Sequence, residues 1–87
     1  MVYFFSLTAS AQRVEDYIEG NAMGPIVLVE ATSEIWKDYQ ENETSDWWPV
    51  TRYGHPDEVP EFGTRKEAEN EYLASERFEI YCRCHNC

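Results

Sequence analysis

Apolar and polar positions in the first third of the chain form short runs that predict a strand, a helix and a second strand. Residues 2–8 are rich in aromatic and β-branched side chains, as expected for a strand. Apolar residues spaced three and four apart predict an amphipathic helix over about residues 11–19, capped by Ser10 and ended by Gly20. The continuous apolar run 25–31 predicts a strand buried on both faces at the sheet centre.

The middle of the chain predicts a second short helix and an edge strand. Residues 34–41 place apolar side chains on one side of a helical wheel and carboxylates on the other, with Thr32 or Ser33 as the cap. Residues 47–53 contain aromatic and β-branched side chains, which favour a strand. Pro49 has no backbone N–H, so this strand is confined to an edge or begins there.

The last third predicts a loop, a helix and a final strand. Residues 54–63 hold two glycines and two prolines and form the longest irregular stretch. Thr64 and Glu67 form a capping box, in which each side chain can bind the backbone N–H of the other, and this motif predicts a helix that runs to about Ser75. Residues 77–83 alternate apolar and polar side chains, which is the period of a strand.

These elements indicate an α+β fold in a single small domain spanning residues 1–87. The expected architecture is a mainly antiparallel, three- to four-stranded sheet with two or three short helices on one face. Eighty-seven residues with 43% hydrophobic content are enough for one core and too few for a second domain. Residues 82–87 are expected to form a frayed, Cys-rich tail.

Charge is the strongest bulk signal of function. Seventeen carboxylates against seven Lys and Arg side chains give a formal net charge of −10. Binding to nucleic acid or to an anionic membrane requires a basic surface, so the composition excludes both as direct partners. A field of this sign instead steers the domain towards basic proteins, among them those that handle DNA or RNA.

The sequence shows neither a membrane span nor a targeting signal. It contains no long apolar run, and its apolar start lacks the positive region and the cleavage site of a signal peptide. Three clustered cysteines, an odd number, fit a reducing compartment better than a disulfide scaffold. We therefore expect a cytoplasmic protein.

The candidate metal ligands are the terminal residues Cys82, Cys84, His85 and Cys87. A structural zinc site usually takes its ligands from two separated pairs, whereas this chain has one cluster, with His55 as the only distant addition. We therefore expect no bound metal. A metal-binding or thiol function of these cysteines, with or without disulfides, stays an alternative.

Catalytic motifs are absent from the sequence. It contains no phosphate-binding loop, dinucleotide-binding motif, zinc-protease motif or EF-hand. His55 lies in the Gly/Pro-rich loop and His85 among terminal thiols, so neither is accompanied by the nucleophile and donor set that covalent catalysis needs. We expect a protein that is not an enzyme and uses no cofactor.

The negative charge is concentrated in residues 34–62, where eight carboxylates and two cations give a net charge of −6. Trp47 and Trp48 lie in this segment, and tryptophan is enriched at binding hot spots. We expect one of them in the core and the other exposed, where it can contact a partner's arginine. A solvated face that serves solubility is the alternative. The candidate partner-binding residues are Glu34, Asp38, Glu41, Glu43, Asp46, Trp47, Trp48, Asp57, Glu58 and Glu61.

Small size, strong acidity, missing catalytic motifs and a mixed α/β pattern make the chain similar to the acidic inhibitors of phages and mobile elements, of the anti-CRISPR and anti-restriction DNA-mimic type. Nuclease immunity proteins are similar in the same respects. Residues 62–69, with Tyr72, Leu73 and residues 77–80, resemble the closing helix and strand of many small phage proteins. The resemblance implies that the protein blocks a basic nucleic-acid channel of a defence nuclease or surveillance complex in the host cytoplasm.

The resulting hypothesis is an acidic binding protein that inhibits a basic nucleic-acid-binding protein or nuclease complex by imitating nucleic-acid charge. One alternative is a toxin-neutralising, immunity or adaptor protein whose target has no nucleic-acid groove. Another is the metal or thiol function of the C-terminal cysteines. The sequence leaves monomer and homodimer open.

Overall fold

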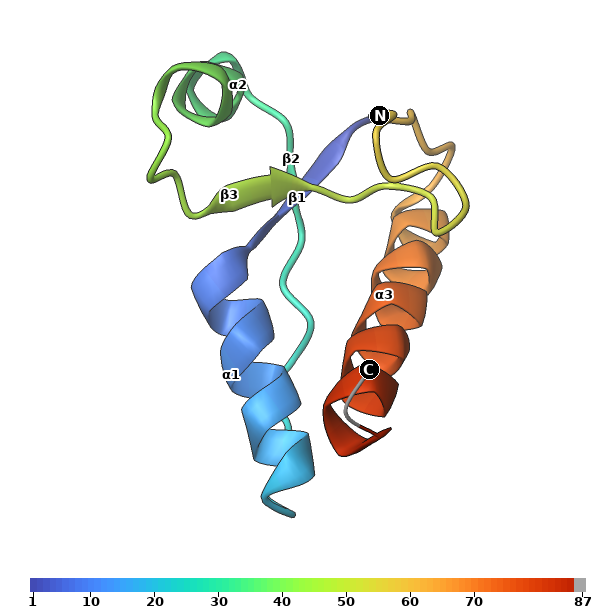
Figure 1. Ribbon diagram of the computed structural model, residues 1–87. Coiled ribbons are helices and arrows are strands. Elements are labelled where there is room, and N and C mark those ends of the chain that lie inside the picture. The colour runs from blue at the N-terminus through green and yellow to red at the C-terminus, as the bar shows by residue number, and fades with distance from the viewer. Residues whose placement is uncertain (86–87) are drawn as a thin grey trace.

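The structure is a computed structural model that describes residues 1–85. Within these residues a three-stranded antiparallel sheet combines with three helices, so the expected α+β class is confirmed. Figure 1 shows α1 and α3 side by side below the sheet, with α2 above it. The elements in chain order are β1 (Tyr3–Ser6), α1 (Leu7–Ile18), β2 (Val29–Glu30), α2 (Ser33–Glu41), β3 (Trp47–Pro49) and α3 (Arg65–His85).

The central strand of the sheet is β1, and the strand order is β2-β1-β3. Both neighbours are antiparallel to β1, with Phe4 opposite Val29 on one side and opposite Pro49 on the other. The predicted edge position of Pro49 is therefore confirmed. Residues 1–85 contain no fourth strand.

The apolar run 25–31 is not the central strand that its composition predicts. Only its last part pairs, as the two-residue edge strand β2. Before β2, arginine side chains bind backbone carbonyl groups: Arg65 donates to the Leu28 oxygen at 2.7 Å, and Arg13 donates to the oxygen of Gly24, which precedes the run. Leu28 is buried in the core, so the apolar content of the run reflects packing of an irregular segment.

Helix α1 begins at Leu7, earlier than expected, and its N-cap is Ser6 instead of Ser10. The Ser6 hydroxyl accepts a hydrogen bond from the Ala9 N–H at 3.2 Å. This cap places the helix start directly after the central strand, so the predicted strand over residues 2–8 is shortened at its C-terminal end.

Helix α2 agrees with the prediction, whereas β3 is shorter than expected. The Thr32 hydroxyl caps α2 by accepting from the Ile35 N–H at 3.2 Å. The strand predicted over residues 47–53 ends at Pro49. The chain then turns, and an isolated bridge joins Arg52 to His55.

Helix α3 starts at the predicted capping box. Thr64 Oγ1 accepts a hydrogen bond from the Glu67 N–H at 3.2 Å. The reciprocal bond is shifted by one residue, because the Glu67 carboxylate accepts from the Gly63 N–H at 3.1 Å. Residues 64–85 contain neither glycine nor proline, so no residue ends the helix at Ser75.

The predicted strand over residues 77–83 is therefore wrong, since these residues continue α3 to His85. Leu73, Ile80 and Cys84 repeat at helical spacing and line one hollow together with α1. The predicted frayed tail at 82–87 is helical over residues 82–85, and residues 86–87 lie outside the described part of the chain.

Different helices cover the two faces of the sheet, so the expected arrangement with helices on one face is not observed. Phe4 packs edge-on against Trp36 and Tyr39 of α2, with ring centroids 5.1 and 5.7 Å away. Phe5, the next residue of β1, points to the opposite face of the sheet and packs against Tyr72 of α3, with ring centroids 5.2 Å apart. The main buried cluster lies on this second face and consists of Tyr3, Leu28, Val50, Phe62, Ala68 and Tyr72.

Candidate partner-binding surface

The acidic face of α2 is present as helical spacing predicts. Glu34, Asp38 and Glu41 line one open surface hollow of about 310 Å³, while Trp36 on the other side of the helix packs on the sheet. Lys37 lines the same hollow, so a cation interrupts the row of carboxylates. The face is negative overall and is held on a rigid element.

Two candidate carboxylates are engaged inside the domain. Asp38 accepts hydrogen bonds from Ser45 Oγ and from Asn42 Nδ2, and these bonds hold the pKa of Asp38 below its ordinary value. Asp46 accepts from the N-cap hydroxyl of α1 and from both the hydroxyl and the backbone N–H of Thr8, which lowers the pKa of Asp46. Both residues therefore fix local structure between α2 and the start of α1.

Trp48 is exposed and Trp47 is half-buried, so the expectation that one of them is a core residue is wrong. Trp48 is 47% exposed and contacts Tyr39 edge-on, with ring centroids 5.7 Å apart. Both rings line an open hollow of about 460 Å³ together with Glu43. Aromatic rings beside a carboxylate suit an Arg or Lys side chain, which is attracted by the ring face and by the charge.

Asp57, Glu58 and Glu61 lie on a different part of the surface. All three are exposed in the long segment between β3 and α3. Figure 1 shows this segment, in yellow, beside the start of α3 and away from α2. The structure thus separates the predicted acidic site into two surfaces. The α2 surface consists of α2 and the loop after it and carries Glu34, Asp38, Glu41 and Glu43, and the loop surface carries Asp57, Glu58 and Glu61. Trp48 shares a hollow with Glu43 of the α2 surface.

Most carboxylates of the two surfaces have no internal partner. Within residues 1–85, six of them make neither a side-chain hydrogen bond nor an ion pair. Their charge is balanced only by solvent and ions, because burial and pairing are both absent. The six are Glu34, Glu41, Glu43, Asp57, Glu58 and Glu61.

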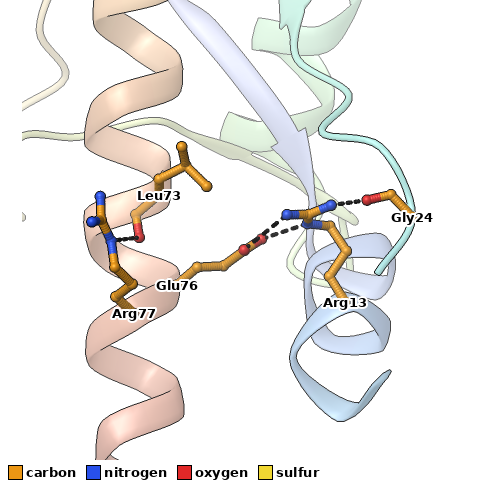
Figure 2. A network of polar contacts seen from close by, with 5 residues as sticks. All are labelled: Arg13, Gly24, Leu73, Glu76 and Arg77. Atoms are coloured by element: carbon orange, nitrogen blue, oxygen red, sulfur yellow. Dashed lines mark hydrogen bonds and ion pairs between the residues drawn. The ribbon is translucent and has the colours of Figure 1, made fainter. Parts of the chain in front are cut away.

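An ion pair between α1 and α3, with its glutamate buried, was not predicted from the sequence (Figure 2). Glu76 is 4% exposed and accepts from Arg13 Nε at 2.8 Å and from Nη2 at 3.2 Å, while Arg13 also donates to the Gly24 carbonyl. Burial raises the pKa of the adjacent Tyr72 to about 12. Ala68, Tyr72 and Glu76 are four residues apart on the buried stripe of α3, a pattern that becomes visible only when the helix is extended past its predicted end.

The terminal candidate ligands do not assemble a metal site in the described part of the chain. Cys82, Cys84 and His85 lie in the last turns of α3, and Cys87 lies outside the described residues. No group of three or more His, Cys, Asp or Glu side chains in residues 1–85 could hold a metal ion. His85 stacks on the Tyr81 ring at 4.2 Å between centroids.

Comparisons of the chain with protein families, with curated proteins and with solved structures found no match. None of the helices in residues 1–85 combines the length and the apolar content that crossing a membrane requires. The functional interpretation therefore depends on the surfaces of the molecule itself.

Proposed function

We propose that this chain is a non-enzymatic inhibitor that binds a basic, nucleic-acid-handling protein, such as a defence nuclease or surveillance complex, and blocks its nucleic-acid channel. The main support is the group of carboxylates without internal partners on α2 and the loop after it, next to the exposed Trp48. Neighbouring charges of one sign repel each other, and a basic partner relieves that repulsion on binding.

The proposed contact residues are Glu34, Glu41, Glu43 and Trp48. Glu34 and Glu41 are seven positions apart, which corresponds to about 10 Å along a helix. A row of negative groups on a rigid helix suits a groove that binds consecutive phosphates through Arg and Lys. Trp48 is the aromatic anchor, and its hollow with Glu43 receives a cationic side chain.

The remaining predicted residues have other roles in this proposal. Asp38 and Asp46 keep their internal hydrogen bonds and position the surface. Asp57, Glu58 and Glu61 contribute to long-range steering, which depends on summed charge and not on contact. The proposed setting is a reducing cytoplasm, where the exposed thiol of Cys84 is stable.

The test compares two variants with the same change in net charge. The first, Glu34→Gln/Glu41→Gln/Glu43→Gln, neutralises the α2 surface, and the second, Asp57→Asn/Glu58→Gln/Glu61→Gln, neutralises the loop surface. Tagged wild type and both variants are used to capture partners from a lysate, and proteins eluted by salt are identified by mass spectrometry. We expect the α2 variant to lose affinity by about tenfold or more and the loop variant to lose much less.

A second measurement separates this proposal from a toxin-neutralising or adaptor role. The captured partner is titrated with double-stranded DNA and with single-stranded RNA in the presence of the wild-type chain. We expect mutually exclusive binding and an affinity that falls steeply with salt. A partner that binds nucleic acid and this chain simultaneously, or equal tolerance of the two variants, would remove the nucleic-acid-mimic proposal.

A further inference from the structure

A groove between α1 and α3 has no role in the proposed inhibition. It is an open hollow with a volume of about 670 Å³. Its walls are mainly apolar and come from Tyr17 of α1, Met23 of the following loop, and Leu73, Ile80 and Tyr81 of α3. The volume falls within the range of about 300 to 1,000 Å³ that is common for small-molecule sites.

Two ion pairs hold the walls of the groove in place. The buried pair Arg13–Glu76 joins α1 to α3, as Figure 2 shows. Arg83 joins the same two helices by binding Glu15 of α1. Because both pairs link the helices without any ligand, the groove is formed in advance of binding.

Arg77 contributes a positive charge to the groove that no carboxylate of residues 1–85 pairs with. In residues 1–85 every other arginine forms an ion pair with a glutamate, whereas Arg77 forms none. Its Nε donates to the Leu73 carbonyl at 3.3 Å, as Figure 2 shows, and its terminal N–H groups have no partner in the described residues. In a chain with seventeen carboxylates, the one arginine of residues 1–85 without a carboxylate partner thus lines a mainly apolar hollow.

We propose that this groove binds a free long-chain carboxylate, with the alkyl chain against Tyr17, Leu73 and Ile80 and the carboxylate on Arg77. The planar guanidinium matches a carboxylate through two parallel hydrogen bonds. The α3 wall from Leu73 to Cys84 extends for roughly 16 Å, which favours a linear ligand over a compact one. An acidic protein segment would be repelled by the net charge of −10 much more strongly than a ligand with one carboxylate.

The binding test uses dodecanoate at concentrations below micelle formation, measured by titration calorimetry with the full chain. Arg77→Gln should weaken dodecanoate binding about tenfold, because one charge-assisted contact is lost. Lys66→Gln is the matched control, since it removes the same charge from an exposed α3 residue that does not line the groove. Butyrate, which has the headgroup without the chain, should bind weakly. Dodecyltrimethylammonium, which has the chain with the opposite charge, should protect the groove residue Cys84 weakly, whatever it binds on the acidic surface elsewhere.

A second readout locates the ligand. Cys84 lines the groove and is exposed, so its alkylation, followed residue by residue with mass spectrometry, should slow when dodecanoate is bound. Equal protection of Cys84 by dodecanoate and dodecyltrimethylammonium, an unchanged affinity for dodecanoate in Arg77→Gln, or unprotected Cys84 at saturation would each overturn the proposal. A dimer in solution that dodecanoate does not dissociate, with Cys84 protected by dimerisation, would assign the groove to a second copy and overturn it as well.

Discussion

The α2 surface and helix α3 are both rich in glutamate, yet their carboxylates are used in opposite ways. Each of the five glutamates of α3 makes a contact inside the domain. On the α2 surface Glu34, Glu41 and Glu43 make none in residues 1–85. Charge density therefore does not distinguish the proposed binding surface from a structural helix. The two differ in whether a hydrogen-bond donor or a cation lies close to each carboxylate.

The cations are also distributed unevenly between these two regions. Arg13, Arg52, Arg65 and Arg83 all pair with glutamates of α3 or with Glu15. The α2 surface has only Lys37, which forms no ion pair within the described residues. Because the few cations are concentrated around α3, the excess negative charge is left on α2 and on the loop after β3.

The largest expected effect comes from the buried contact of α3. Glu76→Gln leaves the guanidinium of Arg13, whose side chain is 12% exposed, without its charge partner and should cost up to about 3 to 5 kcal/mol of unfolding free energy. For a chain of this length the total stability is about 4 to 13 kcal/mol, so the variant is expected to be close to unfolded. Urea denaturation of purified protein, followed by circular dichroism, measures the loss.

The control for this prediction is Glu71→Gln. Glu71 pairs with Arg52 at 3.9 Å on the surface, so its loss should cost less than about 1 kcal/mol. Similar losses of unfolding free energy in Glu76→Gln and Glu71→Gln would contradict this prediction. They would mean that the contact with Arg13 stabilises the fold no more than an exposed ion pair does.

A smaller effect is expected at the start of α3. Thr64→Ala removes the acceptor of the Glu67 N–H and should destabilise the domain by about 0.5 to 2 kcal/mol. Thr64→Ser keeps a hydroxyl at this position and should retain most of the stability. The midpoint of thermal unfolding provides the measurement, and an alanine variant as stable as the serine variant would contradict this account of the helix start.

The elements whose determinants are local were predictable from sequence. Thr32 and Thr64 each cap a helix through their own hydroxyl, and both starts are confirmed. The extent of β2 was not predictable, because the carbonyls beside it bind Arg13 and Arg65 from distant parts of the chain. The same holds for the start of α1, where Asp46 supplies contacts across 38 residues.

The predicted end of α3 at Ser75 was wrong for a different reason. Residues 77–83 fit a two-residue period and a helical period equally well, and the stretch contains no helix breaker to decide between them. Because the helix was predicted to end too early, neither the burial of Glu76 nor the groove lined by Arg77 could be predicted. On the α2 side, helical spacing correctly grouped Glu34, Asp38 and Glu41, but it could not show that Asp38 is engaged by Ser45.

A pH-dependent effect distinguishes an engaged carboxylate from a free one within the acidic segment. Asp46 has a folded-state pKa below its ordinary value of 3.8, because hydroxyl and N–H donors favour the charged form. Its stabilisation is therefore complete above the unfolded-state pKa and is lost as the pH falls through the lower folded-state pKa. The effect should be below about 1 kcal/mol, since the group is exposed.

Asp46→Asn tests this effect, because it imitates the protonated side chain. The variant should be less stable than wild type at neutral pH, and the difference should shrink as the pH falls below the ordinary carboxylate pKa of 3.8. Glu43→Gln, which changes a carboxylate without a partner in residues 1–85, is the control variant. A stability gap between Asp46→Asn and wild type that is constant from neutral to acid pH would contradict the role assigned to Asp46.

The smallest expected effect concerns the fold of the variant used to test binding. Glu34→Gln/Glu41→Gln/Glu43→Gln lowers the formal net charge from −10 to −7, since each substitution removes one negative charge. None of the three side chains has a partner within residues 1–85, so the unfolding free energy should change by less than about 0.5 kcal/mol for each substitution. Relief of like-charge repulsion should make the change slightly stabilising at low salt and undetectable at high salt.

The matched triple variant of α3, Glu67→Gln/Glu69→Gln/Glu71→Gln, has the same net charge but changes three carboxylates that make internal contacts. Thermal unfolding should show it to be the less stable of the two triple variants. If the two triple variants unfold at the same temperature, the carboxylates of α3 are as dispensable as those of α2, and the contrast between a structural helix and a binding surface does not hold.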